Sequence, residues 1–128
     1  MSVTLNQINF NEIKRVIFAS SIAGSMIDKG YVISIMPITP EELSEMVKEA
    51  LKNNIPIINF IGHAPTVSLL NKLLNLNLQP TRAEYKINPN DLIIMVSLSQ
   101  RQQISGQDVS VTDFNQLVIR IVKVIQVI

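Results

Sequence analysis

Cysteine and tryptophan are absent from this chain of 128 residues, and histidine occurs once. Without cysteine the protein has no disulfide, no thiolate zinc finger and no thiol nucleophile. A single histidine excludes a metal site built from several histidines. No apolar run approaches the ~20 residues of a membrane-spanning helix, and the mixed segment 1–11 lacks the basic start of a secretory signal. We therefore expect an intracellular protein with no membrane partner and no bound metal.

Charge is also sparse, because 16% of the residues are charged and the net charge is +1. Strong generic binding to duplex DNA needs many cations that neutralise phosphates, so it is not expected, although a local basic pocket stays open. The sequence contains no Walker loop, dinucleotide fingerprint, nucleophile elbow or pair of catalytic carboxylates. A hydrophobic content of 47% is instead typical of one globular domain with its own core.

Hydrophobic periodicity and turn residues predict a mixed α/β domain with five or six strands and about three helices. The expected strands are residues 14–19, 31–38, 56–61, 83–87, 92–98 and 118–128, and the expected helices are 40–53, 65–75 and a short one at 112–117. Thr39, Pro40 and Glu42 have the spacing of a capping box at the start of the first helix. Residues 1–14 have the weakest pattern and are interpreted as an appendage to a domain spanning 15–128.

Three of the expected strands carry further predictions. Nearly every residue of 56–61 is apolar, which is typical of a strand buried on both faces. The turn-forming sequence at 88–91 predicts a hairpin that joins 83–87 to 92–98. In 118–128 the polar residues recur at every third position instead of every second, which predicts either a bulge or a strand whose start is ambiguous.

The most informative stretch is Ile61, Gly62 and His63, where an expected strand passes into an expected helix. Backbone N–H groups and the helix dipole at such a junction favour an anion, and a glycine lets the backbone approach a ligand closely. An imidazole at this place can hold or donate a proton near neutral pH. A lone histidine is more often structural than catalytic, so the position of His63 is what favours a functional role.

Other candidate site residues are serines and cations placed after strands. Ser20 and Ser21 follow the first expected strand, where they could bind a ligand or simply close the turn. Arg82 and Lys86 are four residues apart on an expected strand and would share a face, with a solvated surface as the alternative. Arg101 follows a strand end, where its planar guanidinium could grip a phosphate or be an ordinary loop cation. With the histidine, these residues suggest phosphate chemistry without a metal.

A resemblance to a known family rests on the residues Ile61, Gly62, His63, Thr66, Leu69, Leu70, Leu73, Leu74, Arg82, Lys86, Asp91, Ser99, Gln100 and Arg101. In order and spacing they resemble small proteins of archaeal viruses, found also in phages and some bacteria, that act as anti-CRISPR ring nucleases. Such proteins degrade cyclic tetra-adenylate, the second messenger of type III CRISPR defence. The resemblance covers about residues 15–128.

The resemblance implies a mixed α/β homodimer that acts in the host cytoplasm, cradles cyclic tetra-adenylate across the dimer cleft and cleaves it without a metal or another cofactor. It implies that a ribose 2′-hydroxyl attacks the neighbouring phosphorus and leaves a 2′,3′-cyclic phosphate. His63 would protonate the departing 5′-oxygen, and Arg101 would stabilise the phosphate. The residues expected to bind the ligand are Ser20, Ser21, Gly62 and Arg82, and Arg82 is assigned to the ligand or to the dimer interface.

The chain departs from the family pattern at two places. Family members commonly have a glutamate about three residues after the position of Arg101, whereas positions 102–104 here are Gln, Gln and Ile. The first strand of the family usually ends in asparagine, where this chain has Ser20. A slow nuclease or a protein that sequesters the messenger therefore stays open. The alternative function is a non-catalytic, dimeric viral protein that binds a nucleotide or nucleic acid, or a virion or host-interaction protein on the same scaffold.

Overall fold

The computed structural model describes residues 8–22, 30–99 and 113–127. Its strands are β1 (Arg15–Ala19), β2 (Tyr31–Ile38), β3 (Ile57–Asn59), β4 (Asp91–Leu98) and β5 (Leu117–Val127). Its helices are α2 (Pro40–Lys52), α3 (Ala64–Leu74) and the 3-10 turns η1 (Phe10–Glu12) and η3 (Phe114–Gln116). The mixed α/β fold is confirmed, and the third expected helix proves to be the short turn η3.

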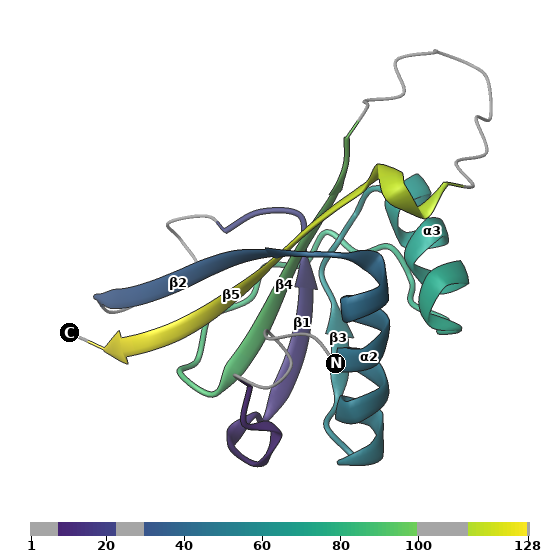
Figure 1. Cartoon of the computed structure of the whole chain (residues 1–128). Coiled ribbons are helices and arrows are strands. Elements are labelled where there is room, and N and C mark those ends of the chain that lie inside the picture. The colour runs from purple at the N-terminus through teal and green to yellow at the C-terminus, as the bar shows by residue number, and fades with distance from the viewer. Residues whose placement is uncertain (1–7, 23–29, 100–112, 128) are drawn as a thin grey trace.

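The five strands form one mixed sheet in the order β2-β5-β4-β1-β3 (Figure 1). β1 lies between β3 and β4 and is parallel to both. β5 runs antiparallel between β4 and β2. Because parallel strands end at the same edge of a sheet, the loops that follow β1, β3 and β4 begin there, and such an edge is where open α/β sheets bind ligands.

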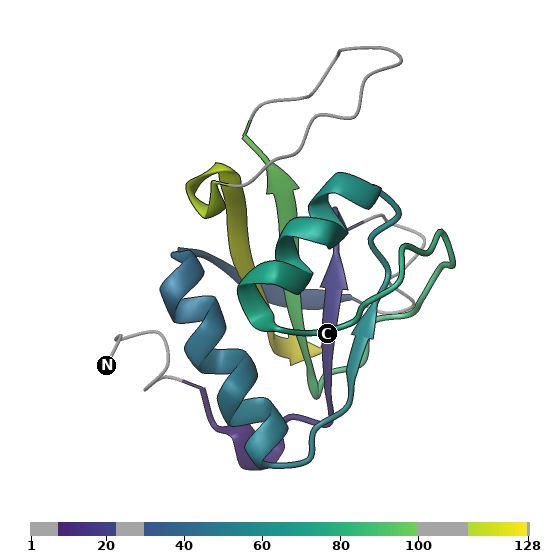
Figure 2. The same cartoon turned by 90° about the vertical axis from the view of Figure 1, so that its right-hand side faces the viewer.

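Both α-helices pack on one face of the sheet (Figure 2). α2 begins at the predicted capping box, in which Thr39 Oγ1 accepts from the Glu42 N–H and Glu42 Oε1 accepts from the Thr39 N–H, each at 3.1 Å. Apolar side chains at helical spacing then face the sheet and form the main core. The main core contains buried residues from α2, α3, β1 and β4. They are Leu43, Met46, Val47, Ala50, Val67, Leu69, Leu70, Leu74, Val16, Phe18, Leu92, Ile94 and Val96.

The opposite face of the sheet is covered by the irregular segment 81–88. Tyr85 and Ile87 are buried there in a second, smaller core, whose buried strand residues are Ile17, Ala19, Ile93, Val122 and Val124. The predicted strand 83–87 and its hairpin with β4 are therefore wrong. Tyr85 and Ile87 alternate with exposed neighbours, which is the period of a strand. This segment, however, packs on the sheet face instead of pairing with a strand.

Two predictions about individual strands have opposite outcomes. β3 is an edge strand whose three residues are only partly buried, so the expected burial on both faces is wrong. The bulge predicted in the last strand is confirmed. The pairing passes from Val32–Gln126 to Ile33–Val124 and leaves Ile125 as the extra residue of β5.

The described part of the expected appendage, residues 8–14, lies against the domain. Ile8, Phe10 and Ile13 pack against the main core. The Lys14 N–H donates to the Asn90 carbonyl at 2.9 Å, immediately before β1 begins. These contacts join the segment to the sheet ahead of its central parallel strand.

An ion pair connects the starts of β1 and β4. Arg15 Nε and Nη2 donate to the two carboxylate oxygens of Asp91 at 2.8 and 2.6 Å. The Asp91 side chain is 1% exposed, against 28% for Arg15, and its Oδ2 also accepts from the Asn88 N–H at 2.9 Å. The bidentate pair therefore ties the two neighbouring strands to the turn at 88–91.

Candidate functional site

The candidate site lies at the edge where the three parallel strands end. The residues that follow these strands are Ser20 and Ser21 after β1, Gly62 and His63 after β3, and Ser99 after β4. A hydrogen bond of 2.8 Å from the Phe60 N–H to the Phe18 carbonyl keeps the first two chains paired up to this edge. Both serines and His63 are exposed, so these sequence-predicted residues share one accessible edge of the sheet.

His63 is the N-cap residue of α3, but its side chain makes no capping hydrogen bond to the helix backbone. Its Nδ1 instead lies 2.7 Å from the Thr66 hydroxyl oxygen. The first turn therefore presents backbone N–H groups and the positive end of the helix dipole beside an exposed imidazole, an arrangement that suits an anionic ligand.

Gly62 brings Arg82 to the same place. A Cβ atom added at Gly62 would lie 3.0 Å from Arg82 Cγ and 3.1 Å from the Thr81 carbonyl oxygen. The absence of a side chain at Gly62 is thus required for close approach. The side chain of the exposed Arg82 therefore lies against Gly62, the residue before His63. The Arg82 guanidinium and the His63 imidazole belong to the same surface.

Two asparagines hold the returning chain that carries Arg82. Asn59 Nδ2 donates to the carbonyls of Ile61 and Gln79 at 3.1 and 2.8 Å. Asn71 exchanges two hydrogen bonds with the backbone of Leu78, at 2.8 and 2.9 Å. Sequence reasoning missed both residues. The available signal was an isolated amide inside an apolar run, since buried amides need partners.

We expect Gly62→Ala to lower both stability and ligand affinity. The Thr81 N–H donates to the Ile61 carbonyl at 3.0 Å, so the Thr81 carbonyl cannot move away from the new methyl group without breaking that bond. A cost of about 1–2 kcal/mol is typical of such overpacking. Thermal unfolding and titration calorimetry measure the two effects, with the substitution Glu45→Ala on the exposed side of α2 as control. Unchanged melting and affinity would show that Arg82 is not held by this contact.

Tyr85 is a titratable residue near the site that does not fit a catalytic role. Its ring stacks on Phe60, two residues before Gly62, with centroids 4.5 Å apart. Its hydroxyl is buried and has no partner among the described residues. Burial, followed by the nearby Asp91 carboxylate, raises the pKa of Tyr85 to about 12. The phenol therefore stays protonated at neutral pH and is not a general base.

The other predicted cations do not all reach this edge. Arg101 lies outside the described residues, so its predicted role stays a prediction. The expected common face of Arg82 and Lys86 is wrong, because they do not lie on a strand. Arg82 lies over Gly62, whereas the Lys86 carbonyl accepts from Arg15 at 3.3 Å, where β1 begins. Arg82 therefore lies where the parallel strands end, and Lys86 lies where they begin.

An open groove of about 560 Å³ lies along α3, and neither His63 nor Arg82 is among the residues that line it. It runs from Ala64 along α3 to the segment 77–80. Much of its lining is polar, and the polar residues are Ser68, Asn71, Lys72, Asn75, Asn77 and Gln79. The groove is therefore separate from the surface formed by His63 and Arg82 and does not add to the case for that site.

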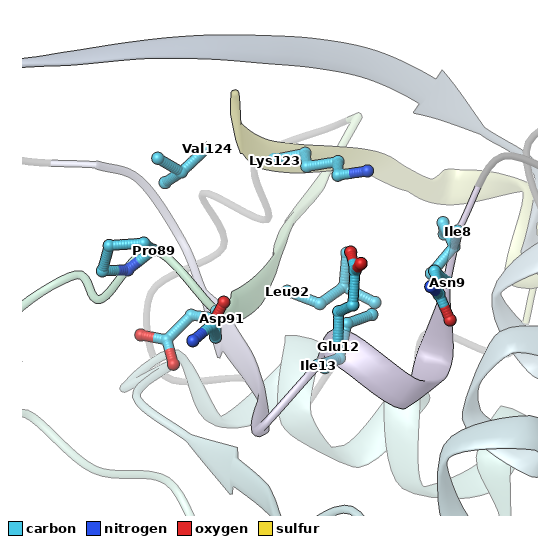
Figure 3. A pocket seen from close by; sticks show the side chains of 10 residues that line it. Ile8, Asn9, Glu12, Ile13, Pro89, Asp91, Leu92, Lys123 and Val124 are labelled. Carbon is cyan, nitrogen blue, oxygen red and sulfur yellow. The ribbon is translucent and has the colours of Figure 1, made fainter. Parts of the chain in front are cut away.

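Another hollow, of about 380 Å³, lies at the opposite edge of the sheet between η1 and the start of β4. Glu12 and Lys123 project into it from opposite sides (Figure 3). Since its lining includes two acidic residues, Glu12 and Asp91, and one cation, Lys123, it does not concentrate the positive charge that a phosphate needs. The edge with His63 is the better candidate for phosphate chemistry.

Two absences apply to the described part of the chain. No three or more histidine, cysteine or acidic residues gather in a way that could hold a metal ion among residues 8–22, 30–99 and 113–127. Within the same ranges, no helix has the length and apolar character needed to cross a membrane.

The model of the STIV B116-like family matches residues 15–121. The chain belongs to this family. Among solved structures it is similar to B116 of Sulfolobus turreted icosahedral virus, with a TM-score of 0.68 and 24% identity over 85% of this chain and 98% of that one. This likeness confirms the α/β fold, and membership of the STIV B116-like family confirms the expected relation to small archaeal-virus proteins. No curated protein matches the chain.

Proposed function

We propose that this viral protein of the STIV B116-like family is a metal-independent ring nuclease that cleaves cyclic tetra-adenylate. The observation that carries the proposal is the exposed His63 at the start of α3, with Arg82 held across Gly62 beside it. A phosphodiester is the group that such a pair suits, because the cation offsets phosphate charge and the imidazole supplies a proton. The resemblance of the sequence to anti-CRISPR ring nucleases supports the same substrate.

The reaction needs no nucleophile from the protein. The ribose 2′-hydroxyl gives its proton to solvent water as its oxygen attacks the adjacent phosphorus in line, the P–O5′ bond breaks, and a 2′,3′-cyclic phosphate forms. His63 gives its proton to the departing 5′-oxygen, while Arg82 and Arg101 offset the charge on the phosphorane. The protein contributes alignment and electrostatic stabilisation, which are the main catalytic terms for phosphate chemistry.

The proposal includes a second copy of the chain as partner, inside the infected host cell. A ring of four nucleotides has two-fold symmetry, so two equal sites related by a two-fold axis match it. Light scattering at micromolar concentration should then give the mass of a dimer. A monomer that still cleaves the ring would remove this part of the proposal.

The second candidate function is binding without cleavage. It is favoured by the sequence 102–104, which lacks the acidic residue common in the family, and by the exposure of His63 without a carboxylate partner among the described residues. Such a protein would hold the messenger and withhold it from host effectors. A nucleotide-binding viral protein of this kind would use the same arginines and helix N-terminus.

Radiolabelled cyclic tetra-adenylate distinguishes the two functions. We expect the ring to be opened in the presence of EDTA, with linear products that end in a 2′,3′-cyclic phosphate. Tight binding with the ring intact after long incubation at excess protein would favour the sequestering function. Neither binding nor cleavage would overturn both.

A further inference from the structure

Thr66 and His63 form a pair that the overall reaction scheme does not use. Among the described residues, Thr66 and Asp91 are the polar residues that are buried, at 2% and 4% exposure. Asp91 is matched by Arg15. The recorded hydrogen bond of the Thr66 side chain runs to His63 Nδ1, at 2.7 Å. A buried hydroxyl is costly without a partner, so this contact accounts for Thr66 being tolerated in the core.

The direction of the hydrogen bond follows from the donors and acceptors that the Thr66 hydroxyl and the His63 ring carry. A threonine hydroxyl has one hydrogen to donate, and in the described part of the chain the recorded partner for it is Nδ1. In the neutral imidazole Nδ1 must then accept, which leaves the ring proton on Nε2. When the imidazole is protonated, the hydroxyl turns and accepts from Nδ1–H. In both states Nε2 carries a proton and points away from the buried Thr66.

We infer that Thr66 is a positioning residue that occupies Nδ1 of His63 and leaves Nε2–H as the donor that faces the departing oxygen. When the imidazolium gives up its Nε2 proton it keeps Nδ1–H, which Thr66 Oγ1 accepts, and proton exchange with water then restores the resting tautomer with the proton on Nε2. Helical geometry supports this role, because the N-cap and the third helical residue are neighbours on the first turn. An ordinary N-cap side chain would bond the backbone N–H of that third residue. His63 bonds its side chain instead, so the ring orientation depends on Thr66. The catalytic consequence rests on the proposed function, whereas the orientation does not.

The matched variants are Thr66→Val, which keeps the shape and removes the hydroxyl, and Thr66→Ser, which keeps the hydroxyl. Because His63 is the one histidine, its ring-nitrogen NMR signals need no assignment among several. We expect wild type and Thr66→Ser to show neutral His63 protonated on Nε2. Thr66→Val should show shifts displaced toward a mixture of the two tautomers. Thermal melts verify that all three proteins are folded.

The kinetic readout separates positioning from binding. Loss of an orienting partner typically costs about 10- to 100-fold, and we expect Thr66→Val to lose this in kcat with KM nearly unchanged, while Thr66→Ser stays close to wild type. Ring-nitrogen signals of Thr66→Val equal to those of wild type would overturn the inference, as would altered signals with unchanged kcat. If wild type does not cleave, the proposed function fails, and the NMR comparison still decides whether Thr66 orients the ring.

Discussion

His63→Ala should reduce the single-turnover rate of cyclic tetra-adenylate cleavage by about 10²- to 10⁴-fold, the usual contribution of a general acid. Binding should be nearly unchanged, whereas stability should fall by about 1–3 kcal/mol, because the buried Thr66 hydroxyl loses its partner. The side chain is exposed, so its removal costs little packing. Under the proposed function the phosphates would be held by Arg82 and by the N–H groups of α3, which the substitution leaves in place. Quenched-flow cleavage with excess protein measures the effect, and calorimetry measures the binding.

The control is Lys48→Ala, which removes an exposed cation from α2. It should cleave at the wild-type rate, because α2 contributes no residue to the edge with His63. A slower rate for Lys48→Ala would show that the loss in His63→Ala is not specific to the imidazole, and the assignment of His63 as the general acid would be rejected. If His63→Ala melts at a much lower temperature and keeps its activity per folded molecule, His63 is structural and the enzymatic proposal fails.

Arg15→Met is the substitution for which we expect the largest loss of stability, about 3 kcal/mol. It leaves the Asp91 carboxylate, 1% exposed, with the Asn88 N–H as its remaining recorded partner. Breaking a buried ion pair by removing one partner typically costs 3–5 kcal/mol, and the partial exposure of Arg15 places the expectation at the low end. Since domains are stable by about 5–15 kcal/mol, urea unfolding should show a large shift of the midpoint.

Lys14→Met is the matched control, because Lys14 is the exposed neighbour of Arg15. It should change the free energy of unfolding by less than about 0.5 kcal/mol. The double variant Arg15→Met with Asp91→Leu should recover part of the loss, since an apolar pair can replace a buried ion pair. A loss below about 1 kcal/mol for Arg15→Met would mean that water reaches Asp91 and that the pair contributes little.

Local patterns were sufficient for the elements whose shape is decided within the element. The capping box at Thr39 and the apolar stripe of α2 depend on residues three or four apart, so the sequence states them directly. Alternation over 83–87 is different. It reports that every second side chain is buried, and a chain lying on the face of a sheet satisfies this as well as a strand does. The same limit applies to β3, whose apolar composition does not tell an edge from a centre.

The candidate site was predictable in part for the same reason. Gly62 and His63 are adjacent, and a strand followed by a helix is enough to place them. The approach of Arg82 to Gly62 requires the chain after α3 to turn back, and Asn59 and Asn71 decide that turn by binding backbone carbonyls. Such contacts involve partners up to 20 positions away. No local period reports them.

β1 lies between β3 and β4 in the sheet, and this position affects how the chain folds. β1 pairs with β3 and with β4, and the ion pair that joins β1 to β4 spans 76 positions. While the nascent chain has reached only α2, β1 has no neighbour on either side and its apolar faces are uncovered. Pairings between distant segments slow folding, and unpaired apolar strands aggregate. The pairing of β1 with β4 therefore forms only after β4 has left the ribosome, and until then one side of β1 is an unpaired apolar edge.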